Sequence, residues 1–251
     1  MSGAGTMLWK EWREQYWRGR PTGMFWAGVG TGLFFEALGA LLGTFSLGEA
    51  AADFGVTAAA WGLVASLGTF AAMAGALAPL STVVDAVAGE RERHTLETLL
   101  AGPLRDREIL WGKAGAQVLY AAAVAGIAAS AGGIVAFAFF GGQALLPVAV
   151  LMPAAVLAGA LAAAFFVALA ILVSLRAPTV KSGQQRLGFA FMPFMFIPLL
   201  FVFVGGAALG GLPPPLLLGL AVGVPFLFLV VVALVVTLLI VRFRRRVLMA
   251  P

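Results

Sequence analysis

The long stretches without charge decide what this chain can fold into. No Asp, Glu, Lys or Arg occurs at 54–84, 114–175 or 187–241, and 24–48 holds only Glu36. A membrane-spanning helix needs roughly 20 apolar residues, so the last two stretches must each contain two helices. Strands of an outer-membrane barrel would instead alternate in polarity over about ten residues. The sequence therefore predicts an all-α membrane protein.

Turn signals divide the two longest stretches. Gly141-Gly142-Gln143 precedes Pro147, and Gly210-Gly211 precedes three prolines at 213–215. The prediction is a single transmembrane domain over 1–251 with six spans, near 24–47, 57–84, 114–140, 147–175, 189–209 and 216–241. Prolines inside these spans each remove a backbone hydrogen bond and can kink the helix, among them Pro79, Pro193, Pro198 and Pro225.

The basic residues predict the orientation of the spans. All 16 Lys and Arg residues fall in the N-terminal segment, the second loop, the fourth loop and the tail. Basic residues are retained on the cytoplasmic side, so both termini are expected in the cytoplasm of a multi-pass protein of the cell (plasma) membrane. The net charge of +5 then reflects topology and does not indicate nucleic-acid binding.

The N-terminal segment 7–20 has the pattern of a helix lying in the plane of the membrane surface. At 100° per residue one arc is apolar and aromatic, with Leu8, Trp9, Trp12 and Tyr16. The opposite arc is charged, with Lys10, Glu11, Glu14 and Arg18. The pattern is compatible with a membrane anchor alone or with an anchor that also contacts a cytoplasmic partner.

The second cytoplasmic loop, 86–112, is the largest polar segment. Thr95 can cap a short helix that ends at Gly102-Pro103, and Asp106 can cap the long third span. The short helix carries an apolar stripe of Leu96, Leu99 and Leu100. Acidic and basic residues balance at 90–113, which favours a protein partner over anionic lipid. A solvated loop resting on the membrane is the alternative.

The same loop carries a motif of a known family. Glu90-Arg91-Glu92-Arg93-x-Thr95-Leu96-Glu97-x-Leu99-Leu100-x-x-Pro103, followed by Arg107-Glu108-Ile109-Leu110 and Gly112-Lys113, resembles the signature of ABC-2-type exporter permeases. The resemblance implies that the short helix is a coupling helix seated on an ATPase subunit. The implied contact residues are Glu90, Arg91, Glu92, Thr95, Leu96, Glu97, Leu99, Leu100 and Pro103. The family usually has Gly where this chain has His94, a departure that affects the local backbone.

The chain lacks the machinery to hydrolyse ATP itself. No G-x-x-x-x-G-K-[ST] phosphate loop occurs, so the sequence predicts no catalytic residues, and one His without Cys makes no metal site. By the resemblance, ATP and Mg belong to a separate ABC ATPase, present in two copies beside a permease homodimer in the lipid bilayer. The alternative is a secondary transporter driven by an ion gradient, which normally needs several intramembrane acids.

Glu36 is the one acid predicted at mid-membrane. It shares a helix face with four glycines whose spacing permits close helix contact, namely Gly28, Gly32, Gly39 and Gly43. The prediction is that Glu36 faces protein and not lipid. Two roles are open: a structural acid that is protonated or hydrogen-bonded, with Ser66, Thr69 or Gln117 as candidate partners, or a residue of the substrate path or its gate.

Overall fold

The computed structural model describes residues 3–16, 26–41, 56–84, 89, 92, 106–174, 177 and 179–189. Throughout this part of the chain the regular structure is helical, without a strand. The chain divides into two compact units, residues 1–83 with 103–167 and residues 84–102 with 168–251. The predicted all-α class is confirmed for the described residues, and the fifth and sixth predicted spans, 189–209 and 216–241, lie almost wholly outside them.

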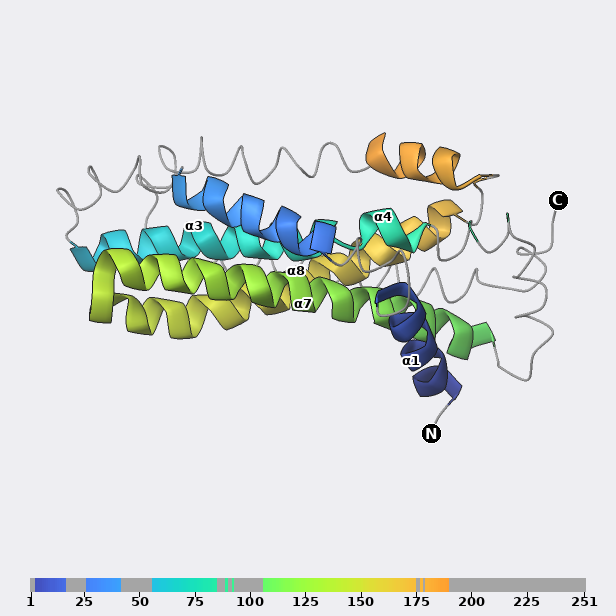
Figure 1. The fold of residues 1–251 in the computed structure, drawn as a ribbon, viewed down its shortest axis with the longest axis horizontal. Coiled ribbons are helices and arrows are strands. Elements are labelled where there is room, and N and C mark those ends of the chain that lie inside the picture. Colours follow the sequence, from blue (N-terminus) through green and yellow to red (C-terminus); the bar gives the residue numbers. More distant parts are fainter. Residues whose placement is uncertain are drawn as a thin grey trace, which may run out of the picture. The chain divides into compact units, whose positions relative to one another are not determined.

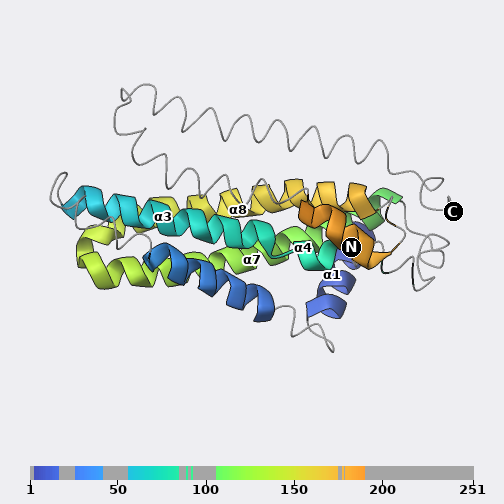
Figure 2. The ribbon, with the colours of Figure 1, turned by 90° about the horizontal axis from the view of Figure 1, so that it is seen from above.

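The first unit is built from long antiparallel helices. In chain order the described helical elements are α1 (Gly3–Tyr16), the helix Trp26–Leu41, α3 (Val56–Leu77), the short α4 (Leu80–Val83), α7 (Asp106–Phe140), the 3-10 turn η2 (Gly141–Ala144) and α8 (Leu145–Ser174), whose residues from 168 onwards belong to the second unit. Figure 1 shows α3, α7 and α8 running side by side, and Figure 2 shows Trp26–Leu41 beside them. The four long helices overlap in sequence with the first four predicted spans.

Among the residues that the structure describes, two helical stretches are long and apolar enough to cross a membrane. They are Ala59–Leu77 and Trp111–Ser174, with mean hydropathies of 1.5 and 2.8. The second stretch, 64 residues long, would measure about 96 Å if straight, roughly three times the hydrocarbon thickness. It folds back at η2, where Gly141 has a φ of 53°. Glycine adopts this left-handed conformation without steric cost, so the predicted turn is confirmed.

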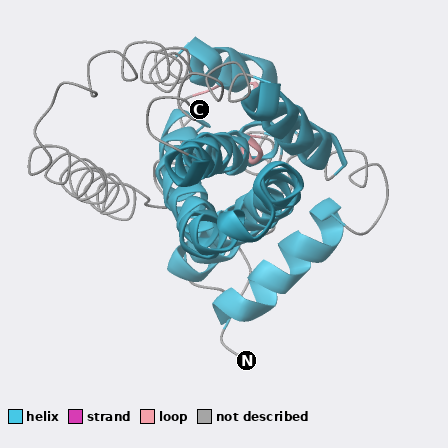
Figure 3. Cartoon of the chain, turned by 90° about the vertical axis from the view of Figure 1, so that its left-hand side faces the viewer, coloured by secondary structure: helices cyan, strands magenta, loops and turns pink. Residues whose placement is uncertain are grey.

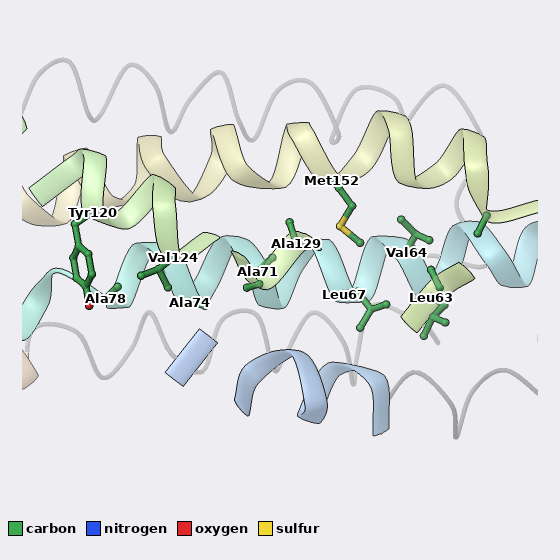
Figure 4. Packing of buried hydrophobic residues seen from close by; sticks show 13 residues of the cluster. Leu63, Val64, Leu67, Ala71, Ala74, Ala78, Tyr120, Val124, Ala129 and Met152 are labelled. Atoms are coloured by element: carbon green, nitrogen blue, oxygen red, sulfur yellow. The ribbon is translucent and has the colours of Figure 1, made fainter. Parts of the chain in front are cut away.

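Small residues let the helices of the first unit approach closely. A methyl group added at Gly75 of α3 would lie 2.9 Å from the carbonyl oxygen of Ala121 in α7. One added at Gly159 of α8 would lie 2.9 Å from the carbonyl oxygen of Ala72 in α3. Figure 4 shows the buried core between them, where Met152 of α8 reaches the leucines and alanines of α3. Backbone contact of this kind stabilises helices in lipid, where hydrophobic burial contributes little.

Pro79 interrupts the second predicted span. α3 ends at Leu77 and α4 begins at Leu80, because proline has no N–H for the helical ladder. The N–H groups of Thr82 and Val83 instead donate to the carbonyl of Pro79 at 3.1 and 2.9 Å. The predicted kink at Pro79 is therefore present as a break between two helices.

Candidate functional site

A buried ion pair fixes the N-terminal helix α1 to the start of α7. Lys113 Nζ donates to Glu11 Oε1 at 2.9 Å, and the two side chains are only 5% and 8% exposed. Glu11, which the sequence placed on the charged arc of 7–20, is therefore buried against α7. Periodicity places a residue on a helix face, but it does not reveal that the face meets a lysine 102 positions later.

Two glycines on α7 make room for α1. A Cβ at Gly112 would lie 2.6 Å from Met7 Cβ, and one at Gly115 would lie 3.0 Å from Leu8 Cδ1. Met7 is almost completely buried in this contact. The Gly112-Lys113 pair, noted in the sequence as part of a motif, thus forms a docking site: its glycine admits the helix and its lysine pairs with Glu11.

The aromatic residues of α1 divide between two environments. Trp9 is 58% exposed, whereas Trp12 is partly buried against the core cluster. Trp111 near the start of α7 and Trp26 at the start of its helix are also exposed. Exposed tryptophans at helix starts are typical of the membrane–water interface. Figure 3 shows α1 lengthwise while most of the long helices are viewed nearly end on. Tyr16 ends α1, and its side chain lies outside the described residues.

Of the predicted coupling residues, the structure describes Glu92. Its Oε1 accepts a hydrogen bond from the backbone N–H of Val180 at 2.8 Å. The other eight lie outside the described residues: Glu90, Arg91, Thr95, Leu96, Glu97, Leu99, Leu100 and Pro103. Within the second unit, Glu92 of the polar segment 86–112 therefore contacts the segment that follows α8.

That segment contains a helix that the charge pattern had assigned to a loop. Residues 180–189 are helical, and Val180 is the first helical residue. Thr179 Oγ1 accepts from the N–H of Ser182 at 3.2 Å, and Ser182 Oγ accepts from the N–H of Thr179 at 3.3 Å. This reciprocal cap leaves the N–H of Val180 for Glu92, whose negative charge suits a helix N-terminus. Basic residues marked this segment as aqueous, but they did not exclude a helix.

Glu36 is buried between its own helix and α7. It is 3% exposed, and a Cβ at Gly132 would lie 2.8 Å from Glu36 Oε2. Gly32, one turn earlier, faces Val124 of α7, while Gly39 faces Phe70 of α3. The placement of Glu36 on a protein-facing glycine surface agrees with the sequence prediction at these positions. Gly43 lies outside the described residues.

The hydrogen-bond partners expected for Glu36 are engaged elsewhere. Ser66 Oγ donates to the carbonyl of Leu63, and Thr69 Oγ1 donates to the carbonyl of Ala65, both at 2.8 Å. Gln117 Oε1 accepts from Thr82 Oγ1 at 2.6 Å. Neither carboxyl oxygen of Glu36 has a hydrogen-bond partner within the described chain. The expected bonds to Ser66, Thr69 and Gln117 are therefore not formed.

A groove of about 460 Å³ between α7 and α8 is apolar and does not include Glu36. Its walls come from Gly126 to Phe137 on α7 and from Val148 to Val156 on α8. Ser130 is its one hydroxyl-bearing residue, and that hydroxyl donates to the carbonyl of Gly126 at 2.7 Å. Among the residues that the structure describes, no group of three His, Cys, Asp or Glu could hold a metal ion.

Comparison with known proteins gives one match at the level of families. A model of the ABC-2 family transporter proteins matches residues 31–240. The matched region contains the second cytoplasmic loop, α3, α7 and α8, and it begins after α1. No match was found among curated proteins.

Proposed function

The chain belongs to the ABC-2 family of transporter proteins, and we propose that it is the permease of an exporter driven by a separate ATPase. The family match over most of the chain carries this proposal. In it, both termini face the cytoplasm, six spans cross the plasma membrane, and two copies form the path together with two ATPase subunits. ATP and Mg belong to the ATPase, since no phosphate-binding loop is present in this sequence.

The proposed mechanism begins at the second cytoplasmic loop. Its short helix, with Leu96, Glu97 and Leu99, docks on the ATPase and moves when nucleotide binds. The loop runs directly into α7, and Glu92 holds the start of helix 180–189. Motion of the loop is therefore transmitted to two helices of this chain.

The buried pair of Glu11 and Lys113 supports a second element of the mechanism. Because α1 is fixed to the start of α7, the two helices move as one body. Trp9 and the other exposed aromatic residues would keep this body at the membrane surface. The break at Pro79 supplies a point where the second span can bend, and Thr82 ties it to Gln117 of α7.

Glu36 is assigned to closure of the path and not to direct contact with the transported molecule. Its carboxyl group lies between packed helices, outside the apolar groove of the described residues. Closure would require the Trp26–Leu41 helix to remain packed on α7, and opening would separate them. The groove between α7 and α8 is lined mainly by Gly, Ala, Val, Ile, Met and Phe, which suits an apolar or amphiphilic substrate.

The test is reconstitution with the ATPase encoded beside this gene. A tagged permease should co-purify with that ATPase, and vesicles containing both should transport only when ATP is supplied. Leu96→Asp and Glu97→Arg should each reduce ATP hydrolysis by the complex, whereas Gln185→Arg on the exposed surface of helix 180–189 should not. Transport without ATP that collapses with the proton gradient would contradict the proposal and support a secondary transporter.

A further inference from the structure

Glu36 lies in the contact between the Trp26–Leu41 helix and α7, a line of close packing that we call the seam. Along this seam Gly28 meets the ring of Tyr120, Gly32 meets Val124, and the carboxyl group of Glu36 fills the space beside Gly132. The absence of a side chain at Gly132 is what allows the carboxyl group to lie there. The carboxyl group is therefore packed directly against the backbone of α7 at Gly132 and is almost completely buried.

The position along the helix places this site deep in the membrane. Glu36 lies ten residues after the exposed Trp26, which corresponds to about 15 Å along a helix. The hydrocarbon layer is roughly 30 Å thick, so the carboxyl group lies near its centre if Trp26 marks the interface.

The surroundings decide which ligand the carboxyl group can hold. No other acidic or basic side chain occurs on α3, on α4 or on α7 from 114 onwards. The titratable group that faces this helix from α7 is Tyr120, two turns away beside Gly28. A metal cation would need several oxygen ligands, whereas a proton needs one and takes up almost no volume. An unpaired carboxylate at this depth would be costly.

We propose that Glu36 is a proton-binding site within the membrane, occupied by one proton while the Trp26–Leu41 helix is packed on α7. The proton comes from water when the seam is open and returns to water when it opens again, and no other bond changes. The inference rests on the membrane-spanning arrangement of the proposed function, and it does not require the ATPase.

A lipid-soluble carbodiimide tests this directly, because dicyclohexylcarbodiimide adds to protonated carboxyl groups in apolar surroundings. The full chain is labelled in lipid nanodiscs at neutral pH, and the peptides are identified by mass spectrometry. The peptide with Glu36 should carry the reagent, and Glu36→Gln should abolish that adduct. Glu11 is the internal control: it is equally buried but paired with Lys113, and it should remain unlabelled.

Infrared spectroscopy gives a second measurement that does not depend on chemical reactivity. The wild-type spectrum should contain the C=O stretch of a buried protonated carboxyl group, and this band should be missing in Glu36→Gln. Two results would overturn the proposal. One is that a water-soluble carbodiimide labels Glu36 and the lipid-soluble one does not; the other is that folded protein shows neither the adduct nor the band. If Glu36 is labelled but no ATPase co-purifies with the wild-type chain, the proposed function alone is contradicted.

Discussion

Lys113 of α7 and Glu11 of α1 form a buried ion pair with an N–O distance of 2.9 Å. The pair joins the N-terminal helix to the first part of the third predicted span, directly after the loop that carries the coupling motif. A lysine can be buried at this position because the carboxylate of Glu11 compensates its charge. Removal of one partner from a buried pair typically costs about 3–5 kcal/mol. In the proposed mechanism the pair makes α1 and α7 a single moving body.

Charge exchange tests this pair. Glu11→Lys or Lys113→Glu alone would bury two like charges, so α1 should leave α7; the double exchange should restore docking. Docking can be followed by cross-linking cysteines at positions 8 and 115, because the natural chain contains no cysteine. Arg13→Glu on the exposed side of α1 is the matched control and should leave the cross-link intact. If both single variants cross-link as efficiently as the protein with the intact pair, the pair does not hold α1 on α7.

The cap of helix 180–189 gives a second prediction. Glu92→Ala removes the acceptor of the Val180 N–H, and loss of a helix cap typically costs about 1 kcal/mol. Amide hydrogen exchange in the first turn of the helix should therefore become several-fold faster. Gln185→Ala, an exposed substitution in the same helix, should leave that exchange unchanged. Unchanged exchange in Glu92→Ala would mean that the reciprocal cap of Thr179 and Ser182 is sufficient.

Packing of α3 against α7 predicts opposite outcomes for two glycines of the same helix. Gly75→Ala would press a methyl group against the Ala121 carbonyl, and overpacking typically costs about 1–3 kcal/mol. Gly62→Ala meets no atom within 4 Å and should be neutral or slightly stabilising, because alanine favours helix. Thermal unfolding in detergent measures both, and equal melting temperatures would contradict the close approach of α3 and α7.

After the break at Pro79, a buried hydrogen bond joins α4 to α7, and it can be removed with little change in side-chain shape. Thr82→Val keeps the volume of the side chain but takes a donor from Gln117, and an unsatisfied buried group typically costs about 1–3 kcal/mol. Thr82→Ser retains the hydroxyl and should unfold near the wild-type temperature. A Thr82→Val protein as stable as wild type would show that Gln117 does not depend on this bond.

Sequence reasoning succeeded where a local pattern determines the structure. The glycine run at 141–142 predicted the turn between α7 and α8, and the spacing of Gly28, Gly32 and Gly39 predicted that Glu36 faces protein. Pro79 predicted the break of the second span.

It failed where the structure depends on partners distant in sequence. The helical pattern placed Glu11 on a charged arc but could not identify Lys113 as its partner, and Glu92 acts as a cap only because Val180 begins a helix. The helix at 180–189 was assigned to a loop because charge indicates an aqueous location, which does not exclude a helix, whereas Asp106, the predicted cap of the third span, stands at the start of α7. The sequence also could not show that Glu36 has no hydrogen-bond partner among the described residues. Ser66 and Thr69 were expected partners, but each hydroxyl donates to a carbonyl of its own helix.

The most direct test of the account is a photo-cross-link from the second cytoplasmic loop. A photoreactive amino acid replaces Leu96 in the full chain, the membranes are irradiated, and the attached protein is identified by mass spectrometry. The account predicts a cross-link to a separate ABC ATPase, with a different yield when ATP is present. A cross-link confined to lipid or to this chain itself, in membranes that contain that ATPase, would contradict it.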